Sequence, residues 1–524
     1  MKPLVGLLLR RARVAAGAAL IAGGLGVPPT TASAAGPGHS LSPTTRFFVP
    51  PPAHGSLEQA SQLLRSGDAT DASLILEMES TPQAVWLDGE TAAQIARGEA
   101  GARQADVDVA RQVRQTMLEA AVENAVPVFV AYNIPGRDCG SFSAGGARNE
   151  ADYDGWTDSL AGAIGEGHAV VLLEPDSLGL IPSNCDHTDN PNGTYPIEVS
   201  GPTIMPTMSQ YPAAIQKYYG ADVERFAELN HAVGALEADP NTVVYLDGVH
   251  SAWLNVPAIS QELLLAGVQR VQGFFTDVSN YQFTPNSVRF GTWISDCIAY
   301  ETVVAPGNWV NQFGAVCPGQ YYNGWSGSGF NGTALNPYGI WSNSGACTAT
   351  SCSGAAADLD STGENQTYAS LLGATEPITH FLIDTSRNGL GPDSMQRYAG
   401  SPFDQPGSVI STLVAGNFCN PPGAGLGDTP TASTGNSLVD AYLWVKIPGQ
   451  SDGQCDPASG VRAWDDAAYT PPITGWPASG TEAFGNFDPL WSIRTDSIIT
   501  DPAAGAWFPQ QALQLAQLAN PPLA

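Results

Sequence analysis

Seven short runs rich in Val, Ile and Leu recur along the chain, and each ends abruptly in polar residues. They lie at 84–88, 126–132, 169–176, 242–247, 271–277, 378–384 and 438–446. Strands that are apolar throughout are buried on both faces, which is typical of a parallel sheet covered by helices. Segments with apolar residues at three- and four-residue spacing alternate with these runs, at 107–125, 153–164, 221–238 and 258–266. This order predicts repeated βα units in an α/β fold with seven parallel strands.

Three longer stretches lack this periodicity, at about 182–212, 292–366 and 392–437, and are rich in Gly, Pro, Asn, Ser and Thr. Loops of this length in a compact protein are usually functional or disordered. The middle stretch also contains clustered aromatic residues and four cysteines, so we interpret it as an ordered lid or wall. No linker divides the chain after residue 56, and 506–518 predicts a last helix. We therefore expect one domain over 56–524, preceded by a flexible, Pro-rich tail at 35–55.

The first 34 residues have the pattern of a secretory signal peptide. Lys2 and three arginines precede an apolar run at 14–27, and the small residues Ala32, Ser33 and Ala34 follow. A transmembrane anchor needs about 20 apolar residues, whereas this run is shorter and is interrupted by glycines. The sequence therefore predicts a secreted, extracellular protein.

The charge balance is strongly acidic, with 21 Lys and Arg against 50 Asp and Glu, or a net charge of −29. Residues 1–34 contain four basic and no acidic residues, so removing them leaves 17 basic against 50 acidic, or −33. Binding to phosphate groups needs clustered Lys and Arg. We therefore expect no nucleic-acid partner and no membrane partner, and the acidity favours an uncharged or cationic substrate.

All eight cysteines follow the signal peptide: Cys139, Cys185, Cys297, Cys317, Cys347, Cys352, Cys419 and Cys455. An even number in an exported protein predicts up to four disulfides. A structural zinc site is typically built on tight pairs such as Cys-x-x-Cys, and no Cys-x-x-Cys pair occurs in the sequence, so we expect no metal site and no cofactor. The acidic segment at 358–364 leaves a calcium loop open as a minor alternative to a solvated loop.

The first motif with chemical content lies at 130–146, where an apolar run ends in Tyr132. Arg137, Asp138 and Cys139 follow before a glycine-rich loop. A tight turn with a surface salt bridge would not explain why a tyrosine, an aspartate and a disulfide candidate gather at one strand end. In parallel α/β barrels the chemistry collects at the carboxyl ends of the strands.

The second motif places two carboxyl groups directly after a buried strand, at Glu174 and Asp176, with Pro175 between them. Burial raises the pKa of a carboxyl group, and a nearby negative charge raises that pKa further. A carboxylic acid that stays protonated near neutral pH can act as a general acid. Helix capping by Asp176 is the structural alternative.

Together these motifs resemble the paired signatures of glycoside hydrolase family 6, the inverting cellulases. Further blocks agree in the same order, at 245–253, 276–281, 384–389 and 444–453, so the resemblance extends from about residue 75 to the end. It implies a distorted barrel of seven parallel strands with surrounding helices. The three long insertions then become loops that roof an active-site cleft.

The resemblance implies a role for each acidic residue of these motifs. Asp176 matches the general acid, and Asp138 matches the aspartate that tunes its pKa and guides the water network. Asp247 and Asp452 match two further aspartates of the cleft. Tyr132 matches a tyrosine under the distorted sugar ring. The catalytic base stays open between Asp452 and a water chain toward Asp138.

The same resemblance implies residues that hold the sugar chain by stacking and hydrogen bonding. They are Trp86, Arg137, Ser143, His250, Trp253, Asn280, Arg387, Phe418 and Lys446. Four positions depart from the pattern and put the outer subsites in doubt. Gln450 replaces a common Glu, Val256 a distant tryptophan and Phe418 a stacking tryptophan, while Ala144 lies near the position of a mobile serine, for which the adjacent Ser143 is the substitute. The resemblance also implies disulfides Cys139–Cys185 and Cys419–Cys455, whereas the other four cysteines allow three connectivities.

The function that the resemblance implies is a secreted hydrolase of cellulose degradation, a glycosidase that cleaves β-1,4-glucosidic bonds with inversion. The long insertions favour an exo-acting cellobiohydrolase that releases cellobiose from cellulose or cello-oligosaccharides and works as a monomer. An endoglucanase of the same family and an enzyme for another β-glucan or xylan are the alternatives. A non-catalytic carbohydrate-binding protein would not need all four aspartates.

Overall fold

The computed structural model describes residues 40–89, 102–140, 143–182, 185, 222–306, 317–321, 334–348, 351–352, 357–401, 403–407, 410, 413–414, 417–455, 488–495 and 497–523. Seven parallel strands form its main sheet in the order β1-β2-β3-β4-β5-β8-β9. Their bounds are β1 Val85–Asp88, β2 Val128–Tyr132, β3 Ala169–Leu173, β4 Thr242–Asp247, β5 Gly273–Thr276, β8 His380–Asp384 and β9 Val439–Leu443. All seven predicted strands are confirmed.

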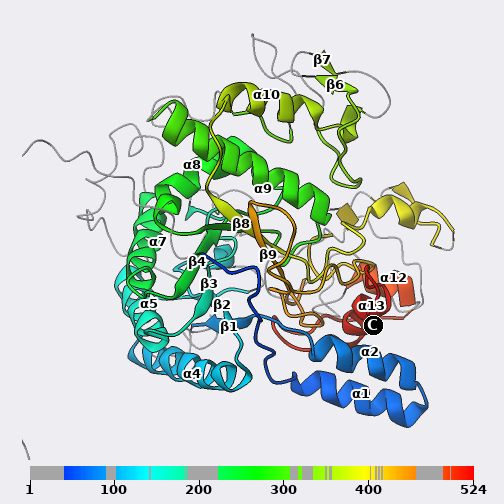
Figure 1. Cartoon of the computed structure of the whole chain (residues 1–524). Helices are drawn as coiled ribbons and strands as arrows, with labels where there is room; N and C mark the ends of the chain where they lie inside the picture. The colour runs from blue at the N-terminus through cyan, green and yellow to red at the C-terminus, as the bar shows by residue number, and fades with distance from the viewer. Residues whose placement is uncertain are drawn as a thin grey trace, which may run out of the picture. The chain divides into compact units, whose positions relative to one another are not determined.

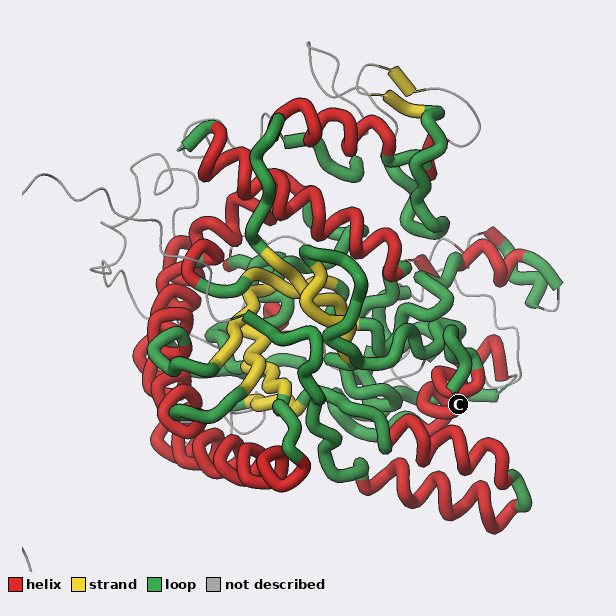
Figure 2. Tube along the Cα trace, in the orientation of Figure 1, coloured by secondary structure: helices red, strands yellow, loops and turns green. Residues whose placement is uncertain are grey.

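A layer of helices covers the outer face of this sheet (Figures 1 and 2). It consists of α4 (Ala102–Glu123), α5 (Glu150–Ile164), α7 (Val223–Leu236), α8 (Val256–Ala266) and α9 (Thr284–Ala299). Each helix packs beside the next one in the chain. The first four correspond to the four predicted helical segments, so the expected βα order is confirmed.

Alternate residues of the strands point to two separate apolar layers. In β2, Phe129 and Ala131 face the helices, while Val128 and Val130 join a second cluster inside the curled sheet. The two edge strands approach each other, since the backbone N–H of Ala84 donates to the carbonyl of Trp444 at 3.0 Å. No strand ladder joins β1 to β9 in the described sheet, so the expected distorted barrel is incompletely closed.

The long stretch at 292–366 was predicted to be irregular, and this is wrong at both ends. Helix α9 continues to Ala299 and a π-helical turn follows at Tyr300–Val304, while α10 occupies Thr362–Leu372. The buried residues of α9 include Phe290, Trp293 and Ile294 at helical spacing. Ser, Thr, Gly and Asp residues between them hide this periodicity in the sequence.

Further helices lie outside the βα repeat. Helices α1 (His54–Ser66) and α2 (Ala69–Glu79) pack together and against α13 (Pro509–Gln517), with α12 (Pro489–Thr495) near them in Figure 1. The last helix was predicted at 506–518 and is confirmed with a later start. A small hairpin of β6 (Cys347–Thr348) and β7 (Ser351–Cys352) lies apart from the main sheet.

The segment before α1 packs on the barrel in its described part. Phe47 and Phe48 are buried, and the backbone N–H of Phe48 donates to the carbonyl of Val126 at 3.0 Å. This stretch lies within the tail that we expected at 35–55 to be flexible. Residues 35–39 and the expected signal peptide at 1–34 lie outside the described residues. Within the described ranges, no helix has the length and apolar content needed to cross a membrane.

Candidate active site

A buried carboxylate at the end of β3 holds the loop that follows β2. Glu174 is fully buried, and its two oxygens accept the backbone N–H groups of Asn133 and Ile134 at 2.9–3.0 Å. Burial raises its pKa to about 7, although these backbone hydrogen bonds oppose the rise. Glu174 was predicted only as one of two carboxyls at a strand end, and the structure shows that it binds backbone.

Asp384 at the end of β8 has a similar arrangement on the opposite part of the sheet. Its Oδ1 accepts the N–H groups of Ser386 and Val445, and its Oδ2 accepts those of Ser279 and Lys446, all at 2.9–3.1 Å. One side chain thereby joins the loops that follow β5, β8 and β9. This fixes the backbone that carries Lys446.

Tyr132, Ser143 and Asp138 form one hydrogen-bonded group at the end of β2. The Ser143 hydroxyl lies 2.8 Å from the Tyr132 hydroxyl and donates to Asp138 Oδ2 at 3.0 Å. The buried Arg137 binds the backbone carbonyls of Tyr132 and Ser143 and lies 4.5 Å from the centre of the Tyr132 ring. Trp86 meets the same ring edge-on, with 5.2 Å between ring centres.

Asp176 is a half-buried carboxyl group surrounded by other acids. Burial raises its pKa well above the usual range, and the negative charges of Asp247, Asp138 and Asp452 raise that pKa further. Lys446 opposes the rise. The group therefore stays protonated at pH values where an ordinary aspartate is ionised.

Asp247 lies deeper than Asp176, with 2% of its surface exposed. Burial raises its pKa to about 7, opposed by backbone N–H groups that include those of Val249 and Leu178. The Val249 N–H donates to Asp247 Oδ1 at 2.9 Å. Because Asp247 is almost fully enclosed, its charge acts on Asp176 rather than on solvent.

Asp452 has the opposite electrostatic environment. Its Oδ2 accepts from Arg387 at 2.9 Å and from the Tyr281 hydroxyl at 3.1 Å, and Lys446 Nζ lies 3.2 Å from Oδ1. Burial disfavours its charge, but Arg387 and Lys446 outweigh this and lower the pKa of Asp452 to about 2. The candidate site therefore contains an acid that keeps its proton near neutral pH and a carboxylate that is ionised above about pH 2.

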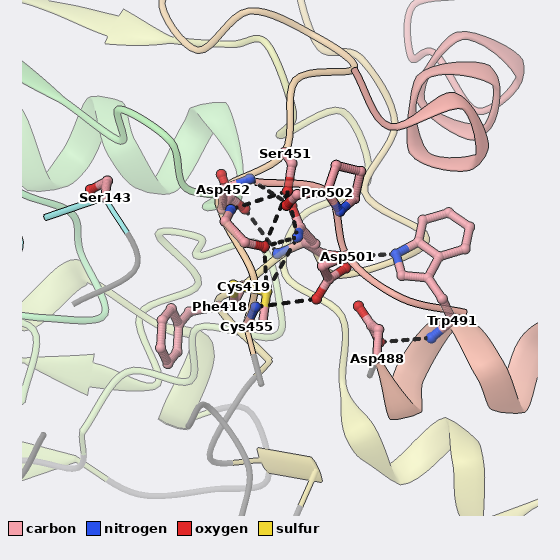
Figure 3. Close-up of a disulfide and its surroundings, with 12 residues drawn as sticks. Ser143, Phe418, Cys419, Ser451, Asp452, Cys455, Asp488, Trp491, Asp501 and Pro502 are labelled. Atoms are coloured by element: carbon pink, nitrogen blue, oxygen red, sulfur yellow. Dashed lines mark hydrogen bonds between the residues drawn. A yellow bond between two sulfur atoms is a disulfide. The ribbon is translucent and has the colours of Figure 1, made fainter. Parts of the chain in front are cut away.

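Asn420 holds the backbone of Asp452 in place. Its N–H donates to Asp452 Oδ2 at 2.9 Å, and its side-chain oxygen accepts the N–H of Asp452 at 2.7 Å. The Trp491 indole N–H donates to the Asn420 carbonyl at 2.8 Å. In the view of Figure 3, Ser143 lies on one side of Asp452, with Trp491 and Asp501 on the other.

His250 and Trp253 form a wall of the candidate site after β4. Their ring centres are 5.7 Å apart, and Trp253 packs so closely on Gly179 that a Cβ there would lie 2.5 Å from the indole. Burial lowers the pKa of His250 to about 4, so its ring is neutral near pH 7. The Tyr321 hydroxyl donates to the Trp253 carbonyl at 2.9 Å and ties the middle insertion to this wall.

Backbone conformations in the left-handed region gather at these strand ends. Asp138 has φ 55°, Asp176 has φ 66°, Val249 has φ 51° and Asp277 has φ 69°. Such angles are unfavourable for residues with a Cβ, and most of all for a β-branched valine. Strained residues of this kind cluster at functional sites, where surrounding contacts hold them.

The structure brings most of the predicted site residues into these groups, with two at the margin. The Asn280 side chain donates to the carbonyl of Val278 at 3.1 Å. Phe418 is 50% exposed, and its carbonyl accepts from Tyr281 at 3.4 Å. Sequence reasoning missed Tyr281 and Asn420 as contacts of Asp452. Their positions directly after Asn280 and Cys419 were the only available signals.

The disulfides include both pairs that the resemblance implied, Cys139–Cys185 and Cys419–Cys455. The remaining pairs are Cys297–Cys317, which links α9 to the middle insertion, and Cys347–Cys352, which closes the small hairpin. The first two pairs anchor the loops that carry Asp138 and Asp452.

The central carboxylate of the possible calcium loop at 358–364 accepts hydrogen bonds from the protein itself. Asp360 accepts the N–H groups of Ser344 and Cys347 at 2.7–2.8 Å and the hydroxyl of Thr362 at 2.7 Å. It therefore organises the adjoining loop. Among the residues that the structure describes, no group of three His, Cys, Asp or Glu side chains could hold a metal ion.

Comparisons with known proteins point to one family. The family model "Glycosyl hydrolases family 6" matches residues 42–519. Endoglucanase A of Cellulomonas fimi is 26% identical over 428 residues, which cover 81% of this chain but only 60% of that protein. Endoglucanase 1 of Streptomyces halstedii is 26% identical, and the match covers 83% of this chain and 91% of that protein. The 1,4-beta-D-glucan cellobiohydrolase C of Emericella nidulans is 25% identical, and the match covers 75% of this chain and 61% of that protein.

Solved structures with a similar chain course include the endoglucanase Cel6 from Mycobacterium tuberculosis. It has a TM-score of 0.48 and 23% identity, with 90% of this chain and 97% of that chain covered. The catalytic core of the cellobiohydrolase Cel6A from Chaetomium thermophilum has a TM-score of 0.49 and 20% identity, with 91% and 98% covered.

Two Asp→Asn substitutions in this site are expected to have different effects on stability at pH 7. Asp452→Asn leaves the buried Arg387 without its counter-charge, which lowers the free energy of unfolding by about 3–5 kcal/mol. Asp176→Asn removes a carboxyl whose ionisation is disfavoured in the folded state, so stability is unchanged or higher. Urea unfolding followed by tryptophan fluorescence measures both.

The pH dependence gives the control for this pair. Because the folded pKa of Asp452 is about 2 and its ordinary value is 3.8, its stabilisation is complete above about pH 4 and disappears as the pH falls through 2. The pKa of Asp176 is raised, so the advantage of Asp176→Asn grows with increasing pH. Equal losses of stability in both variants would contradict the assigned charge states.

Proposed function

Because the chain belongs to glycosyl hydrolase family 6, whose model matches residues 42–519, we propose that it hydrolyses the β-1,4-glucosidic bonds of cellulose with inversion. The observation that carries this proposal is the pair of opposed charge states in one cleft. Asp176 retains its proton because burial and the surrounding acids raise its pKa, and Asp452 is ionised because Arg387 and Lys446 flank it. Hydrolysis of a glycoside with inversion needs an acid on one side of the bond and an activated water on the other.

Asp176 is the general acid in this proposal. It donates its proton to the glycosidic oxygen as the bond to the anomeric carbon breaks. Burial and the repulsion from Asp247 and Asp138 raise the pKa of Asp176, so the proton is still present near neutral pH when the glycosidic oxygen needs it. Tyr132, whose ring contacts both Trp86 and the Arg137 guanidinium, supports the sugar ring at the point of cleavage.

The water that attacks the anomeric carbon has two candidate acceptors for its proton. Asp452 Oδ2 already accepts three hydrogen bonds, from Arg387, Tyr281 and Asn420, and its pKa of about 2 makes it a weak base. Asp138 connects to Ser143 and Tyr132, whose hydroxyl groups can extend a water chain. Either carboxylate is expected to lie about 6.5–9.5 Å from the acid so that the water fits between them.

An uncharged glucan suits the lining of the site. Trp86 and Trp253 offer aromatic faces to the C–H groups of sugars, while neutral His250 and Asn280 offer hydrogen bonds to hydroxyls. Relatives named endoglucanase and cellobiohydrolase share this family assignment. The four disulfides and the N-terminal pattern at 1–34 support secretion.

Exo action that releases cellobiose from non-reducing ends is the finer part of the proposal. The connections from β3 to β4, from β5 to β8 and from β8 to β9 are long, as the roofed members of the family require. Two disulfides, Cys297–Cys317 and Cys419–Cys455, anchor the second and third of these connections. The first connection lies largely outside the described residues. The endo alternative has support in the names of the similar endoglucanases.

Asp176→Asn is expected to lower kcat on cellotetraose by about 10²–10⁴-fold, because a general acid contributes that much. The wild-type rate should fall as the pH rises through the raised pKa of Asp176, since only the protonated acid is active. Asp108→Asn on the exposed face of α4 is the matched control and should keep wild-type rates. A rate near wild type for Asp176→Asn would remove it as the acid.

Inversion predicts that the product first appears as the α-anomer. Proton NMR of a cello-oligosaccharide digest should show the α signal early, followed by mutarotation to the equilibrium mixture. The reference is a retaining β-glucosidase from another family, which gives the β-anomer first. An initial β signal from this protein would contradict the inverting mechanism.

Exo action predicts a slow fall in the viscosity of carboxymethyl-cellulose relative to the sugar released, because chain ends are shortened without breaking the middle of the chain. Viscometry and reducing-sugar assays on the same digest give this ratio. A rapid early fall in viscosity would establish the endo alternative instead.

A further inference from the structure

Arg225 near the start of α7 joins the two loops that carry Asp138 and Asp176. Its side chain is 4% exposed. One terminal nitrogen donates to the carbonyls of Ser177 at 2.8 Å and Leu180 at 3.2 Å. The other terminal nitrogen donates to the carbonyl of Pro135 at 2.8 Å. A single planar guanidinium thus binds backbone after β2 and backbone after β3.

These carbonyls lie close in sequence to the two aspartates. Ser177 directly follows Asp176, and Pro135 lies three residues before Asp138. The Leu180 N–H also donates to the carbonyl of Asp176 at 2.8 Å, so Asp176 begins a tight turn that Arg225 closes from behind. The guanidinium binds the backbone carbonyls of both loops, and Arg225 acts on Asp138 and Asp176 through this backbone.

Glu228, in the same helix, is the acidic neighbour of Arg225, and burial raises the pKa of Glu228 well above its usual range. The Arg225 Nε lies 3.4 Å from Glu228 Oε2, and both side chains are buried. A buried ion pair is often no more stabilising than a hydrophobic pair of the same size, because both charges lose their hydration. The pair therefore has no obvious advantage for stability alone. A fork of several fixed N–H donors, in contrast, can bind separate carbonyls at once, which a lysine ammonium on a flexible stem does less well.

We propose that Arg225 is a positioning residue for hydrolysis, which clamps the loops of Asp138 and Asp176 at a fixed separation. This inference rests on the proposed function, since it assigns a purpose to the distance between two residues with proposed catalytic roles. Glu174 binds the N–H groups of the β2 loop, and Arg225 binds the carbonyls of that loop and of the β3 loop. The two side chains together leave these loops little freedom to move apart.

The separation matters because the charge of Asp138 helps to keep Asp176 protonated. The other groups that act on Asp176 are Asp247, Asp452 and Lys446. If the loops spread, Asp138 moves away and water reaches the acid. Both changes favour ionisation of Asp176 at a lower pH and misplace its proton relative to the bond.

Two variants test the clamp, with Glu228→Gln as the matched control. Arg225→Lys keeps the positive charge beside Glu228 but cannot reach both loops. The double variant Arg225→Met with Glu228→Leu removes the ion pair without leaving one charge buried. Glu228→Gln keeps the guanidinium, its carbonyl contacts and an acceptor oxygen for Nε, and because burial already raises the pKa of Glu228 well above its usual range, the change removes little negative charge near pH 7. Steady-state kinetics on cellotetraose across pH and amide hydrogen exchange of 133–140 and 176–182 are the measurements.

Arg225→Lys and the double variant should lose about 10–100-fold in kcat, as expected for a misplacement on the order of 1 Å, with KM changed less than about twofold. The alkaline limb of kcat should move to lower pH, and amide exchange at both loops should accelerate. Glu228→Gln should keep the wild-type kcat, and its amide exchange at both loops should stay as slow as in the wild type. If the double variant fails to fold, Arg225→Lys alone decides.

The clamp is overturned if a folded Arg225→Lys variant keeps the wild-type kcat, the wild-type alkaline limb of the pH profile and wild-type amide exchange at the two loops. A fall in kcat without faster exchange at the two loops would overturn it as well. The outcome is separable from the proposed function. If wild-type protein releases no sugar while Asp176→Asn changes nothing, the proposed function fails. Hydrogen exchange still shows in that case whether Arg225 holds the loops.

Discussion

Buried carboxylates that bind backbone N–H groups are the constraint on which the site depends. Glu174, Asp247, Asp277 and Asp384 lie at or just after the carboxyl ends of β3, β4, β5 and β8, and each accepts a backbone N–H of a loop. Hydrogen bonds to a charged group contribute about 1.5–3 kcal/mol each, and burial makes an unpaired carboxylate costly. If one of these loops moves away, its buried carboxyl group loses hydrogen-bond partners in an apolar interior, which is costly for any polar group and more so for a charged one. This explains how residues such as Val249 and Asp176 persist at positive φ.

The distribution of positive charge then decides what each aspartate of the cleft can do. Asp176 and Asp452 are the same residue type in the same acidic protein, yet their pKa values move in opposite directions. Asp176 has three carboxyl neighbours and a single opposing cation, whereas Asp452 contacts Arg387 and Lys446 directly. The net charge of the chain does not predict this difference, because only groups within a few ångströms act strongly on a buried carboxyl.

Much of the fold was predictable because buried parallel strands leave a continuous apolar run in the sequence. The helical start of the middle insertion was not, because α9 mixes Phe290 and Trp293 with Ser, Thr and Gly residues. The site was predicted through its motifs, but the contacts between motifs were missed. Tyr281, Asn420 and Arg225 have side chains that could suit many surface positions. Their partners, Asp452 and the loop carbonyls, become neighbours only in the folded chain.

The sequence by itself determined the seven strands, the helices between them and the acidic and aromatic residues at the strand ends, because these depend on local patterns of burial and on short motifs. Only the tertiary structure decided which carboxyl is protonated, which is ionised and which binds backbone. Asn420 and Asp452 are 32 residues apart, and Trp491 and Asn420 are 71 apart. Packing of the connections around β8 and β9 brings such segments together, and charge and hydrogen bonding act only over that short distance.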